Sequence, residues 1–316
     1  MVLTKAKGEK KIDRTFFALG TINNIKIYNS RNEDAIDEAI ERINQIDNQM
    51  SAFKPESDIS KLSKNAGNGF QTVHADTFEL IQRAVTFGAL SNGVFDITIR
   101  PLVELWSINK KGDFIPSDSE IEKVLGLVKY QNIQFNKESL GVSLKNHGQS
   151  LDLGGIAKGF AADEVKRILL NNRIHSAIIN LGGNIITIGK RPDGRPWQIG
   201  IQNPLASRGV QLGVITETNK TIVTSGSNEQ FFIKDGIRYH HILDPRTGKP
   251  AQSSLLSITV VCNNSTDADA LTTALFILGP EKGMPLLNKM KAEAIFVTED
   301  LSVIVSNGLK NNFVLL

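Results

Sequence analysis

The segment LDLGGIAKGFAAD, residues 151–163, joins a short apolar stretch to the start of an amphipathic helix. We expect a strand that ends at Leu153, a glycine pair that lets the backbone approach a ligand, and a helix whose first amides can bind an anion. In a simpler interpretation, Asp152 caps the helix and Lys158 is solvated. The segment taken alone favours this simpler interpretation.

The same segment does not match the common phosphate-binding fingerprints. A P-loop places its lysine after the last glycine and follows it with Ser or Thr, whereas here Lys158 precedes Gly159 and Phe160 comes next. The pattern GxGxxG is also missing from the segment. The segment is therefore neither a P-loop nor a Rossmann phosphate loop.

Around this segment, helical and strand patterns alternate along the chain, which predicts one α+β body. Besides the helix that starts near Ile156, apolar residues recur at helical spacing within 33–50, 76–91, 120–128 and 268–278. Strand patterns predict a strand or hairpin within 16–28, hairpins within 130–145 and 292–306, and a series of strands between His175 and Val261. Such a series indicates mainly antiparallel sheet. The segment FDITIRP, 95–101, is expected to be extended.

The composition, with 41% hydrophobic and 22% charged residues, is ordinary for a soluble globular protein. The net charge of +3, from 36 basic and 33 acidic residues, gives no broad electrostatic footprint for nucleic acid. No apolar run approaches the roughly 20 residues that a transmembrane helix needs. Cys262 is the single cysteine, which excludes an internal disulfide and a thiolate metal cluster; we expect it to be buried and inert.

We expect residues 1–13 to form a flexible basic tail and residues 14–316 to form a single domain. The N-terminus lacks the apolar core of a secretory signal, so a cytoplasmic location is expected. An extracytoplasmic location, with a leader removed, is the alternative.

The segment STDADALTTALF, 265–276, is a candidate metal site. Asp269 and Thr273 are four residues apart, so on a helix their oxygens share one face and can hold Mg²⁺. Asp269 also has the spacing of a capping box with Thr266, and taken alone the segment narrowly favours that structural role. Thr272 adds a hydroxyl nearby, but its position is equally consistent with exposure to solvent.

Two further segments carry candidate side chains. In YHHILDPRTGKP, 239–250, a strand would point His240 and His241 to opposite faces, so only one of them can enter a given cleft. Without further support, a lone histidine is more often structural than catalytic. In GVFDITIRPL, 93–102, Asp96 lies among large apolar residues and needs partners, which are either donors of a ligand or amides of the neighbouring loop.

Eight segments, in this order and spacing, resemble those of the ApbE family, flavin transferases that use FAD to attach FMN covalently to other proteins. They are ALGT, MSAFKPESDISKL, GVFDITIRPL, LDLGGIAKGFAAD, INLGGNI, TSG, HHILDPRTGKPA and DADALTTALFILG. Together they extend from about Leu19 to Gly279. The resemblance implies an ApbE-like, T-fold-related α+β architecture of mixed, largely antiparallel sheets with flanking helices. Two intimately associated subdomains would have the flavin site between them.

The resemblance also implies the residues of the site. The flavin nucleotide would be contacted by Leu19, Phe53, Val94, Phe95, Asp96, Asp152, Lys158 and Leu243. Mg²⁺ would be held by the backbone carbonyl of Gly155 together with Asp269 and Thr273. Some family members carry an aspartate at the position of Thr272. His241 would lie beside the reacting groups as the base, so His241 and Asp269 are the catalytic candidates.

The activity that the resemblance implies is that of an Mg²⁺-dependent FAD:protein FMN transferase. A Thr or Ser hydroxyl of a target flavoprotein would attack the FMN-side phosphorus of FAD, and AMP would leave, while Mg²⁺ and Lys158 stabilise the negative charge. Two alternatives are an FAD pyrophosphatase that uses water as acceptor and an FAD-binding carrier without chemistry. Retention of Asp269, Thr273 and His241 argues against the carrier, whereas the sequence does not separate transferase from hydrolase.

Overall fold

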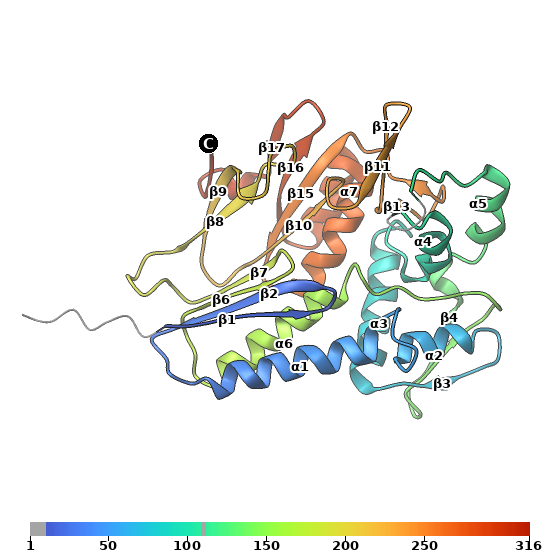
Figure 1. The fold of residues 1–316 in the computed structure, drawn as a ribbon, viewed down its shortest axis with the longest axis horizontal. Coiled ribbons are helices and arrows are strands. Elements are labelled where there is room, and N and C mark those ends of the chain that lie inside the picture. Colours follow the sequence, from blue (N-terminus) through green and yellow to red (C-terminus); the bar gives the residue numbers. More distant parts are fainter. Residues whose placement is uncertain (1–10, 109–111) are drawn as a thin grey trace, which may run out of the picture.

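The computed structural model describes residues 11–108 and 112–316 as an α+β fold around an eight-stranded sheet (Figure 1). From edge to edge, the strands of this sheet are β1 (Lys11–Ala18), β2 (Thr21–Tyr28), β6 (Ala177–Leu181), β7 (Asn184–Ile188), β10 (Thr221–Gly226), β15 (Leu255–Cys262), β16 (Glu293–Thr298) and β17 (Val303–Val305). Every pairing among the described strands is antiparallel. The α+β class and the antiparallel sheets expected from the sequence are confirmed.

Four smaller sheets surround the large one. One three-stranded sheet has the order β18 (Phe313–Leu315), β9 (Gln211–Glu217), β8 (Trp197–Gln202). The other has the order β3 (Gln71–Thr72), β5 (Gly141–Leu144), β4 (Ile133–Asn136). Two are paired strands, β11 (Phe231–Lys234) with β12 (Ile237–His240) and β13 (Leu243–Asp244) with β14 (Lys249–Pro250). The hairpins expected within 16–28, 130–145 and 292–306 are confirmed as β1–β2, β4–β5 and β16–β17.

The helices of the described chain differ widely in length. They are α1 (Asp34–Met50), α2 (Asp58–Lys64), α3 (Ala75–Leu90), α4 (Arg100–Trp106), α5 (Asp118–Leu125), α6 (Ala157–Asn171) and α7 (Ser265–Lys289), with 3-10 turns η1 (Ile97–Ile99), η2 (Tyr130–Asn132) and η3 (Asn307–Leu309). In Figure 1, α1 and α6 run along the lower side of the molecule beneath the β1–β2 hairpin, and α7 stands beside β10 and β15. α6 and α7 therefore pack between the large sheet and α1 or α3, and they bring residues 157–171 next to 265–289.

α1 shows why the predicted helices form. Ile36, Ile43 and Ile46 are fully buried and recur at helical spacing, so one face of the helix enters the core. The side-chain oxygen of Asn32 accepts a hydrogen bond from Ala35 N, which satisfies one free amide at the start of the helix. The prediction of a helix within 33–50 is confirmed.

Three predictions about local structure are wrong. Residues 151–153 do not form a strand, and residues 97–106 are helical rather than extended. The helical course has a local cause, because Asp96 caps the turn by accepting from Thr98 N, and Pro101 stands in the first turn of α4, where a missing amide costs nothing. The expected tail over 1–13 is too long, since β1 begins at Lys11; residues 1–10 lie outside the described residues.

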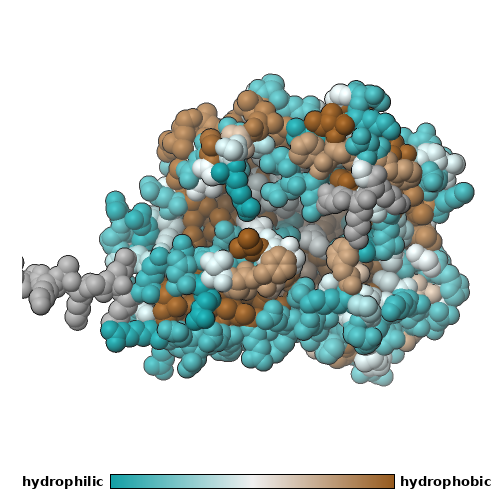
Figure 2. Space-filling model, in the orientation of Figure 1, coloured by the Kyte–Doolittle hydropathy of each residue, from teal (hydrophilic) through white to brown (hydrophobic). Residues whose placement is uncertain are grey.

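The surface in Figure 2 differs between the two sides of the molecule. The lower side, along α1, is mainly hydrophilic, whereas apolar surface is more frequent over the sheets and hairpins in the upper part.

Cys262 is buried with Sγ against Asn264 O, and burial raises its pKa to about 11, as expected for an inert thiol. Within the residues that the structure describes, no helix combines the length and apolar character needed to cross a membrane.

Candidate active site

A pocket of about 200 Å³ lies where α4 meets the loop after α1 and the base of the β11–β12 hairpin. Three of the predicted site residues line it, namely Phe53, His241 and Leu243. Its floor belongs to a small apolar cluster in which Leu243 packs with Trp106 of α4. The structure thus brings together residues from three segments that are far apart in the sequence.

Arg100 also lines this pocket, although it was not predicted from the sequence. Its buried guanidinium binds Glu104 (Nε to Oε1, 2.8 Å) and Asp152 (Nη1 to Oδ2, 3.3 Å). The same group lies 4.4 Å from the centroid of the Phe53 ring, a cation–π contact. The sequence feature that could have predicted this role is a lone arginine in the apolar run ITIRPL, because a cation that is buried there needs partners.

His241 follows β12 and faces the pocket from the base of the hairpin. Its backbone N–H donates to Gln230 O (3.1 Å), and its Nδ1 lies 3.4 Å from the same oxygen. Burial lowers the pKa of His241. The hydrogen bond with the Gln230 carbonyl opposes this in part, and the positive charge of Lys158 lowers the pKa further. The imidazole is therefore neutral at neutral pH and able to accept a proton.

His240 points to the other side of the strand, as the sequence predicted. It is buried, its Nε2 lies 3.0 Å from Ala251 O, and Ile242 N donates to its Nδ1 at 3.3 Å. Its ring meets the edge of Phe276 on α7 at a centroid distance of 5.4 Å. Both ring nitrogens of His240 are thus used inside the fold, which leaves His241 as the histidine of the pocket.

A second group of predicted residues meets where α6 begins beside α7. Gly159 N donates to Asp269 Oδ2 at 2.9 Å, although in a regular helix this amide would bind the carbonyl of Gly155. Among the described residues, no amide donates to the Gly155 carbonyl. A Cβ placed on Gly155 would lie 3.3 Å from Thr273 Oγ1, so this residue adjoins the Thr273 hydroxyl. The three predicted metal ligands are therefore neighbours.

The chemistry of these oxygens fits a hard cation. The described chain contains no cluster of three or more His, Cys, Asp or Glu side chains suited to a metal, so the donor set is one carboxylate, one hydroxyl and one carbonyl. Asp269 is 4% exposed, and its Oδ1 lies 4.0 Å from Lys158 Nζ. The side chain of Thr273 makes no hydrogen bond within the described residues. Mg²⁺ commonly takes one carboxylate and completes its shell with phosphate and water, which this donor set allows.

The pocket and the oxygen group are connected through residues 152–158. Asp152 Oδ2 binds Arg100 of the pocket, while Asp152 Oδ1 accepts from Gly154 N at 2.8 Å. Lys158 Nζ donates to Gly154 O at 3.2 Å and is close enough to His241 to affect its pKa. The ring of Phe95 lies beside Gly155, because a Cβ there would be 3.3 Å from Phe95 Cε2. The two groups therefore form one continuous site.

Local interpretations of three side chains need correction. Asp152 does not cap α6, because the residue at the helix start is Ile156. Asp269 does not form a capping box with Thr266: α7 is capped by Asn264, whose side chain accepts from Asp267 N. Thr272 is fully buried rather than exposed, and its hydroxyl donates to Asp269 O and accepts from Ser225 Oγ.

The carboxylate of Asp96 follows the structural alternative. It accepts from Thr98 N (2.8 Å), Thr98 Oγ1 (2.6 Å) and Tyr130 N (2.9 Å), and burial raises its pKa despite these bonds. Its neighbour Val94 is buried in the core. Leu19 lies at the tip of the β1–β2 hairpin with a φ of 54° and packs against the main core. None of these three residues is among those that line the pocket.

The fold and this site define an α+β protein in which an apolar and cationic pocket is linked, through residues 152–158, to oxygens of the kind that a hard cation prefers. The chain belongs to the ApbE family, whose sequence profile matches residues 19–296. This confirms the resemblance inferred from the motifs.

Relatives and solved structures agree over almost the whole chain. An FAD:protein FMN transferase of Klebsiella pneumoniae (strain 342) is 36% identical over 290 residues, covering 92% of this chain and 90% of that protein. The FAD:protein FMN transferase of Treponema pallidum (strain Nichols) is 33% identical, with coverage of 95% and 88%. The ApbE protein of Thermotoga maritima superposes with a TM-score of 0.88 at 31% identity, covering 96% and 99% of the two chains. For the flavin transferase ApbE of Vibrio cholerae, the TM-score is 0.87 at 26% identity, with the same coverage.

Proposed function

We propose that this chain is an Mg²⁺-dependent FAD:protein FMN transferase that attaches FMN, through a phosphoester, to a Thr or Ser of a target flavoprotein. One observation carries the proposal: Lys158 lies near Asp269, which is next to Gly155 and Thr273, and also near the neutral His241 that lines the pocket. Relatives that bear the transferase name match most of this chain, which supports the same reaction here.

In the proposed site, FAD occupies the pocket with its pyrophosphate directed to the start of α6. Phe53, Phe95 and Leu243 supply apolar surface for the flavin, and Arg100 and Lys158 supply positive charge for the phosphates. Leu19, Val94 and Asp96 would support the flavin from further away. Mg²⁺, when bound, would neutralise the pyrophosphate and polarise the bond that breaks.

His241 serves as the base in this mechanism. Its neutral imidazole takes the proton of the Thr or Ser hydroxyl as the hydroxyl oxygen bonds to the FMN-side phosphorus. The phosphorus–oxygen bond to AMP breaks, and AMP leaves with the electron pair of that bond. The ammonium of Lys158 stabilises the negative charge on the departing phosphate.

The test uses peptides that each carry one Thr or Ser within randomised flanks, incubated with the chain, FAD and MgCl₂. We expect a covalent FMN adduct by mass spectrometry and one AMP for each adduct. Release of AMP and FMN without an adduct would support the FAD pyrophosphatase instead. Binding of FAD with neither adduct nor AMP would support the carrier and contradict the transferase.

A further inference from the structure

The β11–β12 hairpin is an exposed two-stranded ribbon that rises directly from the proposed active site. Gln230 precedes β11 and His241 follows β12, and both line the pocket. The turn, Asp235 and Gly236, has φ values of 51° and 76°, which suits a tight two-residue hairpin. At about 3.4 Å per residue, the four-residue strands extend roughly 13 Å from the pocket.

One face of the hairpin is held against the body of the molecule. Phe232 and Tyr239 are directly opposite each other and stack at a centroid distance of 5.0 Å, and Tyr239 stacks on Trp106 of α4 at 6.0 Å. Near the tip, Lys234 Nζ donates to Asp113 O at 3.3 Å. This face orients the hairpin relative to α4 and the pocket.

The other face and the tip expose apolar side chains. Phe231 is 38% exposed, Ile233 is 56% exposed, and Ile237 at the tip is 52% exposed. Figure 2 shows apolar surface mixed with polar surface in the upper part of the molecule, where Figure 1 places the hairpin. Exposed apolar groups gathered beside a site mark surfaces that contact a partner. Because β11 and β12 pair only with each other in the described chain, each also has an edge to which an extended segment can add.

Arg238 of β12 places a positive charge on the exposed face of the hairpin. It is opposite Ile233, and its guanidinium lies 4.4 Å from the centroid of the Phe231 ring. It forms no ion pair within the described residues, and its buried Nη1 has no hydrogen-bond partner. A cation held over an aromatic ring without a carboxylate is complementary to an acidic group on a partner.

We propose that the β11–β12 hairpin is the docking surface for the acceptor protein, on the basis of the transferase function proposed above. Its occupant is an extended acceptor segment in which an apolar side chain and a carboxylate lie within about four residues of the target Thr or Ser, the length of the strands. The apolar side chain packs on Phe231 and Ile233, and the carboxylate pairs with Arg238. The hydroxyl then reaches His241 at the base of the hairpin.

The peptide library tests this proposal through sequence preference. We expect the wild-type chain to select peptides with acidic and apolar flanks, and Arg238→Glu to invert the preference towards basic flanks by about tenfold in kcat/KM. Ile233→Asp should raise KM for the selected peptides without changing FAD binding, measured by quenching of flavin fluorescence. Val314→Asp is the matched control, because Val314 on β18 is similarly exposed, at 61%, and should leave both unchanged.

The outcomes separate this proposal from the transferase function. Adduct formation without flank preference, or with a preference that Arg238→Glu leaves unchanged, would overturn the docking surface and leave the transferase standing. No adduct with any peptide would overturn the transferase, and the docking surface with it. Loss of FAD binding in Ile233→Asp would show that this variant is misfolded. The docking surface is then tested by Arg238→Glu alone, through whether the flank preference inverts.

Discussion

At the scale of single residues, the site depends on which of two adjacent histidines faces the pocket. His240 and His241 are neighbours in sequence, yet His240 binds Ala251 O and Ile242 N inside the core, and His241 faces the pocket. His240 is the last residue of β12 and His241 follows the end of that strand, and the two side chains leave the backbone towards different sides. One histidine therefore stabilises the fold while the other remains available for proton transfer.

Replacing His241 tests its role as the base. We expect His241→Ala to slow adduct formation by about 100-fold or more, the usual contribution of a general base, with FAD affinity largely kept. Because burial lowers the pKa of His241, the wild-type rate should fall only below pH 6.5, the ordinary value, as the imidazole takes up a proton. An unchanged rate for His241→Ala, measured by mass spectrometry of the adduct, would end this assignment.

Replacing Asp269 tests the cation site. Asp269→Asn keeps an oxygen that can accept from Gly159 N but removes the negative charge. We expect turnover to fall by about 100-fold at fixed MgCl₂ and to recover in part at higher MgCl₂. Asp267→Asn is the control, because Asp267 on the same helix pairs with Arg83 outside the site. Equal Mg²⁺ dependence of both variants would remove Asp269 from the site.

At the scale of elements, α6 and α7 are joined by reciprocal hydrogen bonds from each helix to the other. Asp163 of α6 accepts from Ser265 N, Thr266 N and Thr266 Oγ1 at the start of α7, at 2.7 to 2.9 Å. Asp269 of α7 accepts from Gly159 N near the start of α6. These bonds hold the two helices in the register that places the predicted metal ligands side by side.

Gly159 is required by this close helix contact. A Cβ at this position would lie 2.2 Å from Ser265 O and 2.8 Å from Asp269 Cβ. We expect Gly159→Ala to lower the free energy of unfolding by about 2 kcal/mol and to weaken Mg²⁺-dependent turnover, because the helices must separate. Gly126→Ala is the control, since the space around Gly126 is open. Chemical denaturation measures both, and equal stability of the two variants would contradict the contact.

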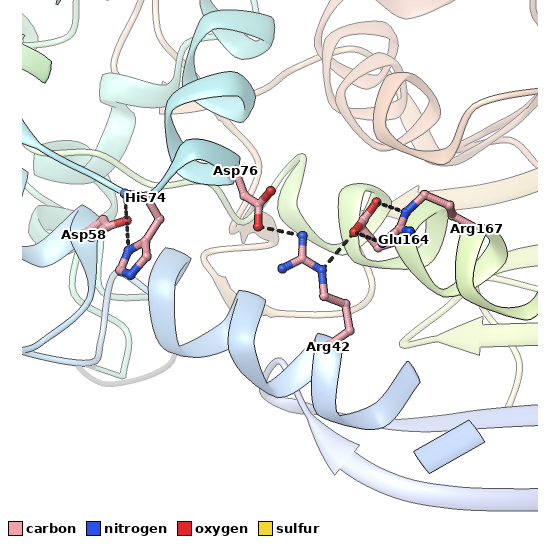
Figure 3. A network of polar contacts seen from close by, with 6 residues as sticks. All are labelled: Arg42, Asp58, His74, Asp76, Glu164 and Arg167. Carbon is pink, nitrogen blue, oxygen red and sulfur yellow. Dashed lines mark hydrogen bonds and ion pairs between the residues drawn. The ribbon is translucent and has the colours of Figure 1, made fainter. Parts of the chain in front are cut away.

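Arg42 joins three helices in the network of Figure 3. It binds Glu164 of α6 (2.8 Å) and Asp76 of α3 (2.6 Å), and Glu164 also binds Arg167. The bonds from Arg167 and Arg42 lower the pKa of Glu164, so its contribution to stability is present above pH 4.5, its ordinary value, and is lost as the pH falls further. A separate pair, Asp58 with His74, lies nearby on α2 and at the start of α3.

Removal of Arg42 measures the value of this network. We expect Arg42→Ala to lower the free energy of unfolding at neutral pH by about 2 kcal/mol, because it leaves two partly buried carboxylates without their shared cation. The loss should become smaller as the pH falls below 4.5, because protonation of Glu164 removes the charge that Arg42 pairs with. Arg195→Ala removes an exposed pair with Asp193 and serves as the control with little expected effect. A loss independent of pH would contradict an electrostatic origin.

At the scale of the whole molecule, His240 makes folding sensitive to acid. Burial lowers its pKa from 6.5 to about 4. Above pH 6.5 both states are neutral, whereas between pH 6.5 and 4 only the unfolded chain binds the proton. We expect the free energy of unfolding to fall by about 3 kcal/mol across this range. The His240→Gln variant should lose this part of the pH dependence in denaturation curves, and an identical slope in both proteins would contradict it.

The amino-acid sequence by itself determined the elements and the family. The isoleucines of α1, the turn residues of the hairpins and the glycines of 151–163 act over a few residues, where spacing and backbone preference decide the structure. The sequence also contains, in order, the motifs that identify the ApbE family. The resemblance to that family implied Gly155, Asp269 and Thr273 as metal ligands, and the structure places these three residues side by side. Its errors are local, at residues 95–101 and 151–153 and in the cap of α7, where side chains bind neighbouring backbone in ways that periodicity does not reveal.

The tertiary structure alone decided which of these groups meet. Gly159 and Asp269 are 110 positions apart, and Arg100 and Asp152 are 52 apart. No spacing in the sequence encodes either contact, because each depends on how packed elements approach one another. The same reason explains why Arg100 lies at the site and why Asp96 bonds to Thr98 and Tyr130: a buried charge is placed by the partners that the fold brings within hydrogen-bond distance.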